Sequence, residues 1–332
     1  MPLTPTLSTA LLAVAEACRV ARAVQRELAA VKTLTKEDLS PVTVADFAAQ
    51  AVVCLRLHAG LGSFDLVGEE SAGELRETSG DAMNNAVTRA VRDIWPEISE
   101  SRVHDAIDFG NHDASAESYW TLDPVDGTKG FLRGGQYAIS LALIERGQVV
   151  AGVLGCPNLG PDFARSFNDP DPVGTLFYAT RDGGAWSLAA TDTADRAQRI
   201  RVATDRPLAD LRMCESVESG HSRLDAAHHI RTRLRITGEP ARLDSQCKYA
   251  VVARGQADAY LRLPTRHDYV EKIWDHAAGA LIATEAGAKV TDIHGKTLDF
   301  STGTGLSANK GVVCASASHH AALLDAIAAL ED

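Results

Sequence analysis

The sequence lacks paired cysteines, a long apolar run and an excess of basic residues. Its six cysteines are far apart, with no CxxC pair and no histidine at zinc-ligand spacing, so we expect them to be buried, reduced thiols. No run approaches the roughly 18 apolar residues that a membrane-spanning helix requires, and the first residues lack the basic start of a signal peptide. These absences predict a cytoplasmic protein with no membrane partner.

Basic residues are outnumbered by acidic ones, 33 to 44, which gives a formal net charge of −11. This balance argues against a nucleic-acid partner, because phosphate backbones are bound by clustered lysines and arginines. The same charge would repel a small phosphate ester. If the substrate is an anion, the protein must therefore bind cations beside it.

The chain has 332 residues, which exceeds the size at which single hydrophobic cores tend to split. Apolar periodicity predicts helices over residues 8–31 and 45–59, and "YAISLALIERGQVVAGVLGCP" predicts a hairpin of two buried strands. Strands and helices alternate in two successive sets. We expect a layered α/β chain with an N-terminal subdomain over residues 1–170 and a C-terminal subdomain over residues 171–332.

The stretch "LDPVDGTKGF" places two aspartates three positions apart around a proline. Asp123 precedes Pro124 and is biased toward an extended backbone, whereas the proline suits the first corner of a turn. The turn would fold Asp126 back beside Asp123, and two adjacent carboxylates repel each other unless a cation lies between them. Hard cations such as Mg²⁺ prefer oxygen ligands, and the Val125 carbonyl could add another. The stretch predicts a metal site, with an ordinary strand-to-helix corner as the alternative.

The two residues that follow predict an anion site. If a helix begins at Gly127 and Thr128, their backbone N–H groups are free to bind an anion. A metal and a phosphate would then lie side by side.

Further acidic residues stand near expected helix or strand ends: Asp46, Glu69, Glu70, Asp275 and Glu285. Taken singly, Asp46 and Asp275 are explained as helix caps, and the glutamate pair as a solvated loop. Their occurrence together with the aspartate turn favours a shared metal site.

These segments together resemble a known superfamily. "LDPVDGTKGF" resembles the D-P-[IV]-D-G-T signature of the inositol monophosphatase superfamily, "WDHAAGALIATEAGA" resembles its second signature, and "VGEES" its third metal-binding segment. Within that superfamily the chain is similar to the 3′(2′),5′-bisphosphate nucleotidases, through "SPVTVADFAAQ", "SVESGHS" and "LDSQCKYAVVARGQADAYLRLP" among others. The resemblance implies an αβαβα sandwich of alternating helix and sheet layers. It also implies hydrolysis of adenosine 3′,5′-bisphosphate, with inhibition by Li⁺.

The resemblance implies two to three Mg²⁺ ions. The first would contact Glu69, Asp123 and the Val125 carbonyl, the second Asp123, Asp126 and Asp275, and the third Asp46 and Glu69. Thr128, paired with Asp46, would orient and activate the attacking water, with Glu69 also in the catalytic set. Bound cations would lower the pKa of the water, neutralise the phosphate and stabilise the leaving oxygen.

The resemblance also implies nucleotide contacts, most of them in the C-terminal subdomain: Gly127, Thr128, His221, Ser245, Lys248, Arg262 and Asp275. Lys248 and Arg262 suit the phosphate that is not cleaved, because cationic donors form charge-assisted hydrogen bonds to phosphate. Lys129 and Arg133 are either phosphate contacts or solvated charges, and solvation is favoured for Arg133. The expected partner is a small molecule, and a monomer is favoured.

One departure and several alternatives remain. The second signature usually ends in two glycines, but Ala288 stands at the last position, where a positive φ would strain it.

Haloacid-type phosphatases also use an aspartate pair, although theirs lie two apart without an intervening proline. Inositol polyphosphate 1-phosphatase, inositol monophosphatase or fructose 1,6-bisphosphatase activity would share the metal ligands, and 3′-phosphoadenosine 5′-phosphosulfate is a further candidate substrate. A non-catalytic binder of adenosine bisphosphate is the alternative from another class.

Overall fold

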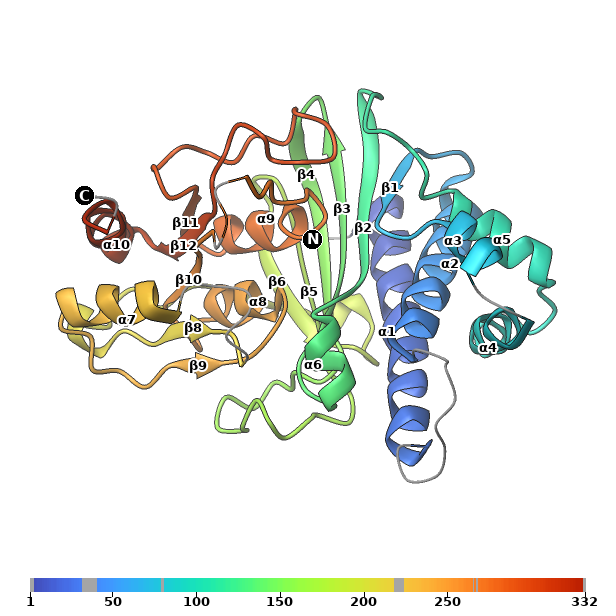
Figure 1. Ribbon diagram of the computed structural model, residues 1–332, viewed down its shortest axis with the longest axis horizontal. Helices are drawn as coiled ribbons and strands as arrows, with labels where there is room; N and C mark the ends of the chain where they lie inside the picture. Colours follow the sequence, from blue (N-terminus) through green and yellow to red (C-terminus); the bar gives the residue numbers. More distant parts are fainter. Residues whose placement is uncertain are drawn as a thin grey trace.

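The computed structural model describes residues 3–31, 41–78, 81–217, 224–264, 266 and 268–330. Its α-helices are α1 (Pro5–Val31), α2 (Pro41–Leu61), α3 (Ala72–Thr78), α4 (Asp81–Arg92), α5 (Glu100–Asp108), α6 (Thr128–Arg133), α7 (Leu224–Arg233), α8 (Cys247–Ala253), α9 (Ala277–Glu285) and α10 (Ala317–Ala328). Its strands are β1 (Leu66–Gly68), β2 (Ser118–Asp126), β3 (Ala138–Glu145), β4 (Gln148–Cys156), β5 (Thr175–Thr180), β6 (Gly184–Ala189), β7 (Gln198–Ile200), β8 (Met213–Glu215), β9 (Ala241–Arg242), β10 (Ala259–Arg262), β11 (Ala288–Thr291) and β12 (Val312–Ser316). Figure 1 shows their arrangement.

The strands form two sheets. The first has seven strands in chain order, β1 to β7, in which β1 runs parallel to β2 and the other pairs are antiparallel. The predicted hairpin is confirmed as β3 and β4, which turn at Arg146 and Gly147 with φ values of 50° and 73°. The second sheet has five strands in the order β11-β12-β10-β8-β9.

Helices and sheets alternate in five layers (Figure 1). Helices α1 and α2 pack on one face of the first sheet, and α9 packs on β3 to β6 on its other face. Both α8 and α9 also contact the second sheet, whose outer face carries α7 and α10. Every residue of α9 from Ala277 to Ala283 is buried, because a helix between two sheets must be apolar all round. The expected αβαβα sandwich is confirmed.

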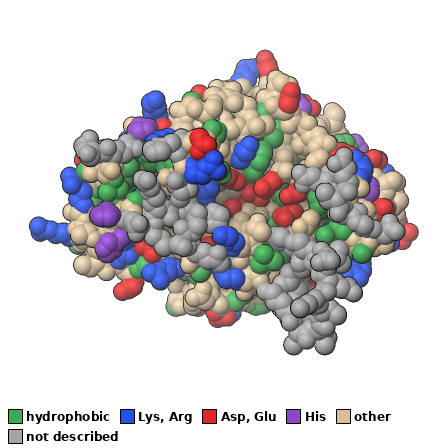
Figure 2. Space-filling model, viewed as in Figure 1, with side chains coloured by type: hydrophobic (Ala, Val, Ile, Leu, Met, Phe, Trp, Pro, Cys, Tyr) green, Lys and Arg blue, Asp and Glu red, His purple; other side chains and the backbone are tan. Residues whose placement is uncertain are grey.

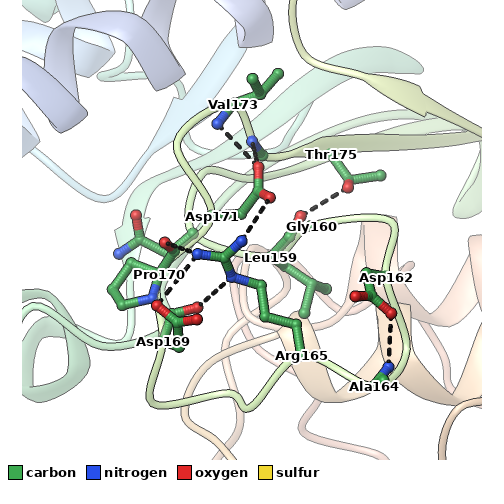
Figure 3. A network of polar contacts seen from close by, with 12 residues as sticks. Leu159, Gly160, Asp162, Ala164, Arg165, Asp169, Pro170, Asp171, Val173 and Thr175 are labelled. Atoms are coloured by element: carbon green, nitrogen blue, oxygen red, sulfur yellow. Dashed lines mark hydrogen bonds and ion pairs between the residues drawn. The ribbon is translucent and has the colours of Figure 1, made fainter.

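The expected boundary at residue 170 does not coincide with a change of sheet. Strands β5 to β7 continue the first sheet to Ile200, and the second sheet begins at Met213. The polar segment before β5 is attached to this sheet, because the Thr175 hydroxyl in β5 donates to the Leu159 carbonyl at 2.6 Å. Within the segment, Arg165 contacts Asp169 at 3.1 Å and Asp171 at 3.7 Å (Figure 3). It is therefore an ordered connection within one sheet.

Helix α2 begins four residues earlier than predicted, at Pro41, and continues past Gly60. Asp46 therefore lies inside the helix, so the helix-cap explanation of this aspartate is wrong.

Residues Thr43–Leu61 of this helix are also long and apolar enough to cross a membrane, contrary to our expectation from the sequence, but 67% of that window is buried inside the protein. It contacts α1, α4, α5 and β2, as a core helix of a globular protein does. The six cysteines are buried and unpaired, as expected.

Candidate active site

The two aspartates of the central motif lie on one irregular strand. Asp123 and Asp126 both belong to β2, and the pairing of β2 with β3 shifts register between them. Pro124 stands at the shift, where its missing N–H costs no ladder hydrogen bond. The Oδ1 atom of Asp123 accepts the Val125 N–H at 3.1 Å. The predicted turn is thus a bulge inside the strand.

Parallel pairing of β1 with β2 brings Glu69 beside Asp123. Gly68 is paired with Leu122, and the N–H of Glu69 donates to the Leu122 carbonyl at 3.2 Å. The carboxyl groups of Glu69 and Asp275 both lie close enough to Asp123 to influence its ionisation. Three chain segments that are far apart in sequence therefore meet at one buried aspartate, which is only 2% exposed.

Asp46 approaches the same cluster from helix α2. One turn after it, the buried Gln50 side chain donates to the Glu70 carbonyl at 2.7 Å and accepts the Glu70 N–H at 3.2 Å. This reciprocal pair of bonds fastens α2 to the segment that carries Glu69. Burial, followed by repulsion from Glu70 and Glu69, raises the pKa of Asp46.

The carboxylates raise each other's pKa, which fits a cation site. Burial raises the pKa of Asp123 well above its usual value, with repulsion from Glu69, Asp126 and Asp275 adding to the effect. Glu69 keeps part of its surface in the pocket, yet desolvation by the pocket walls and repulsion from Asp275 raise its pKa to about 7. Such a group is fully ionised at neutral pH only with positive charge beside it. The all-oxygen donor set suits Mg²⁺.

The segment after Asp126 begins a helix, as the anion-site prediction requires. Gly127 has a φ of +91° and caps α6, which starts at Thr128. A side chain at position 127 would approach the Cβ of Ser245 to 2.7 Å, so the glycine permits both the backbone angle and the close contact. Helices α2 and α6 pack together, but no hydrogen bond joins Asp46 to Thr128 among the described residues. The water-activating pair stays a prediction.

One pocket of 340 Å³ contains acidic and basic side chains together. Its lining includes Glu69, Asp123, Val125, Asp126, Gly127, Thr128, Lys129, Ser245, Lys248, Arg262 and Asp275. Figure 2 shows the same mixture of charges, with Asp and Glu side chains gathered near the middle of the face and Lys and Arg side chains to one side. Apart from Asp46, which is not among the lining residues, and His221, which lies outside the described residues, the predicted site residues meet in this pocket.

Lys248 is held in a defined position although it is almost fully buried. Its ammonium group donates to the Ser216 hydroxyl at 3.1 Å and lies 5.5 Å from the centre of the Tyr260 ring. Burial lowers the pKa of Lys248, against the attraction of Asp244 and Asp126. Among the described residues, no carboxylate lies within ion-pair distance of Lys248, and a phosphate group at this end of the pocket would supply such an anionic partner.

Gln246 is a site residue that the sequence interpretation missed. Its backbone N–H donates to the Asp126 carboxylate, and its side chain donates to the Trp274 carbonyl at 2.9 Å. It therefore connects Asp126 to the segment that carries Asp275. Its place between Ser245 and Lys248 in "DSQCKY" was the available signal, but the side-chain contact depends on the fold.

Three further expectations are settled by the structure. Solvation was favoured for Arg133, and this residue is exposed and is not among the residues that line the pocket, although it also forms an ion pair with the Asp244 carboxylate. The backbone strain predicted for Ala288 is absent, because the positive φ of +100° belongs to Gly287, and Ala288 begins strand β11. Glu285 accepts two backbone N–H groups at 2.8 Å in the β5–β6 turn, so its role is structural.

A second cluster of potential metal ligands comprises Glu271, Asp275 and His276, whose ligand atoms lie within 4.8 Å of one another. Glu271 already pairs with Arg262 and with His276, each at 3.2 Å. An arginine in contact with the carboxylate disfavours a cation there. Of this cluster, we therefore assign only Asp275 to the metal site.

Comparison with known proteins agrees with this geometry. Residues 3–331 match the model of the inositol monophosphatase family. The chain belongs to this family, whose members are generally Mg²⁺-dependent; this membership removes the haloacid-type alternative.

The curated relatives are more specific. A 3′(2′),5′-bisphosphate nucleotidase of Emericella nidulans is 44% identical over 85% of this chain and 86% of its own length. Proteins of the same name from Schizosaccharomyces pombe and Oryza sativa are 40% and 39% identical, over 87% and 98% of this chain and 84% and 94% of their own lengths.

Solved structures support the fold alone, because their sequence identities are low. The extragenic suppressor protein suhB from Bartonella henselae has a TM-score of 0.63 at 22% identity, covering 98% of this chain and all of that one. CysQ from Bacteroides thetaiotaomicron has a TM-score of 0.59 at 20% identity, covering 92% and 96%.

Proposed function

We propose that this protein is a Mg²⁺-dependent phosphoric monoester hydrolase. It removes the 3′(2′)-phosphate of adenosine 3′(2′),5′-bisphosphate and releases AMP and phosphate. The observation that carries the proposal is the single pocket lined both by the Asp123 carboxylate cluster and by Lys248 and Arg262. A bisphosphate needs two different anion sites, one for the phosphate that is cleaved and one for the phosphate that is retained. The names of the curated relatives point to the same substrate class.

The acidic residues would hold two to three Mg²⁺ ions: Asp46, Glu69, Asp123, Val125 through its carbonyl, Asp126 and Asp275. Bound Mg²⁺ would supply the positive charge that offsets the phosphate and increases the acidity of water. The burial of Asp123 and the raised pKa of its neighbours support this role, because buried carboxylates that repel one another are stabilised by a cation between them.

The other pocket residues position the substrate. The first backbone N–H groups of α6, which have no intrahelical acceptor, would hold oxygens of the cleaved phosphate near Thr128. The hydroxyl group of Thr128 would orient the attacking water, with Asp46 as its partner. Lys248 and Arg262 would bind the retained 5′-phosphate through charge-assisted hydrogen bonds.

Phosphate release should be measured with Mg²⁺ from adenosine 3′,5′-bisphosphate, 3′-phosphoadenosine 5′-phosphosulfate, inositol 1,4-bisphosphate, inositol 1-phosphate and fructose 1,6-bisphosphate, each with and without Li⁺. We expect a strong, lithium-sensitive preference for the adenosine substrates. The variant Asp123→Asn, purified in parallel, controls for contaminating phosphatases. Preference for an inositol or sugar phosphate would overturn the substrate assignment, and tight nucleotide binding without turnover would indicate a binder.

A further inference from the structure

We propose that Glu271 is a positioning residue that sets the orientation of Arg262 toward the retained phosphate. This inference rests on the proposed function, in which Arg262 binds that phosphate. Glu271 is not among the residues that line the pocket, so it would not touch the substrate. It acts through the arginine.

A buried chain of hydrogen bonds leads to Arg262 from the interior. The hydroxyl group of Tyr249 lies 2.9 Å from Nδ1 of His276, and Nε2 of His276 lies 3.2 Å from Oε2 of Glu271. The other carboxylate oxygen, Oε1, accepts Nε of Arg262 at 3.2 Å. Tyr249, His276 and Glu271 are 0%, 1% and 4% exposed. Both oxygens of Glu271 therefore have fixed partners inside the protein.

The contact with Glu271 uses the inner nitrogen of the Arg262 guanidinium. An arginine has five N–H donors in a rigid plane, so fixing Nε also fixes the direction of the two outer nitrogens. The Arg262 side chain is 23% exposed and lines the pocket. Among the described residues, Glu271 is the carboxylate within ion-pair distance of Arg262. Tyr269, which also lines the pocket, interacts with Arg262 as well, and because a guanidinium has five N–H donors, the remaining donors are available to an anion in the pocket.

Stability alone is a weak reason for this arrangement. Burying a carboxylate and a guanidinium costs desolvation energy that their attraction only partly offsets, and apolar replacements are often as stable. The pair does, however, hold a planar cationic group at a fixed angle, which bidentate recognition of phosphate requires. His276 also follows Asp275 directly. Glu271 therefore holds Arg262, the arginine proposed to bind the retained phosphate, beside the segment that carries the metal ligand Asp275.

The test compares Glu271→Gln with wild type in steady-state turnover of adenosine 3′,5′-bisphosphate, with AMP and inorganic phosphate as inhibitors. AMP carries the retained phosphate, whereas inorganic phosphate occupies the site of cleavage. We expect KM and the inhibition constant of AMP each to rise about tenfold, the loss typical of a weakened charge-assisted bond. The inhibition constant of inorganic phosphate should stay unchanged, and kcat should fall less than KM rises.

Three further variants keep the result decisive. Glu145→Gln changes an exposed glutamate at the end of β3 and should alter no constant. The double variant Glu271→Gln with Arg262→Ala should bind AMP no more weakly than Arg262→Ala alone, because the two residues act as one unit. If Glu271→Gln does not fold, Glu271→Asp retains the charge at a shorter reach and should show the same selective loss of AMP inhibition.

Equal weakening of AMP and inorganic phosphate, or additive losses in the double variant, would overturn the positioning role while leaving the proposed function intact. A wild-type protein that neither turns over adenosine 3′,5′-bisphosphate nor binds AMP would overturn the proposed function, and this inference with it.

Discussion

Replacing Asp126 by asparagine should stabilise the metal-free protein while removing its activity. Burial, followed by repulsion from Asp275, raises the pKa of Asp126 from 3.8 to about 6. The folded state therefore binds this proton more tightly than the unfolded state does, and an ionised Asp126 destabilises the fold. A rise of about 2 units, at 1.36 kcal/mol per unit, corresponds to about 3 kcal/mol of unfolding free energy.

The sign of the shift defines the pH range. The destabilisation is fully present above the folded pKa of about 6, fades as the pH falls, and is gone below the unfolded pKa of about 4. Asparagine resembles the protonated aspartate at every pH and can still accept the N–H of Gln246. In EDTA, Asp126→Asn should exceed wild type by up to about 3 kcal/mol at pH 8 and should equal it near pH 4.

Urea denaturation in EDTA and in excess Mg²⁺, followed by tryptophan fluorescence, measures the difference. Mg²⁺ should stabilise wild type, because a ligand that binds only the folded state favours it, and should stabilise the variant less, because one of the proposed ions loses a ligand. Asp105→Asn is the control: this exposed carboxylate lies 3.8 Å from Arg102, and its loss should change stability by less than about 0.5 kcal/mol. An Asp126→Asn protein that is less stable than wild type in EDTA at pH 8 would refute the electrostatic reasoning. Equal stabilisation of variant and wild type by Mg²⁺ would refute the assignment of Asp126 as a metal ligand.

Three other predictions test neighbouring conclusions. Arg262→Ala should raise KM for adenosine 3′,5′-bisphosphate at least about tenfold through the lost charge-assisted bond, whereas Arg266→Ala, at an exposed ion pair, should not; an unchanged KM in the first would remove Arg262 from the substrate site. Glu285→Ala should lower the unfolding free energy by about 1–3 kcal/mol, since two backbone N–H groups lose their acceptor, with KM unchanged; equal stability in urea would contradict that role. Gly287→Ala should cost about 1 kcal/mol or more at its φ of +100°, and Ala288→Gly should bring no gain; a more stable Ala288→Gly protein would mean that Ala288 is strained after all.

The sequence alone predicted the features that depend on residues adjacent in the chain. The hairpin of β3 and β4, the helix start at Thr128 and the oxygen donors of "DPVDGT" follow from local backbone preferences and side-chain chemistry. Even here, local signals had limits. The predicted start of α2 was too late, because Asp46 resembles a helix cap. The neighbouring residues give no signal that the helix begins at Pro41. The αβαβα arrangement came from the family resemblance and not from periodicity.

Only the tertiary structure decided which residues share the site. Glu69 lies beside Asp123 because β1 pairs in parallel with β2, and Asp275 joins them because α9 packs against the first sheet. The contacts of Arg133 with Asp244 and of Arg262 with Glu271 were likewise invisible in the sequence. A local pattern shows which face of a helix or strand is buried, but not what it is buried against. That choice is made when the layers pack, since packing brings together side chains from distant parts of the chain.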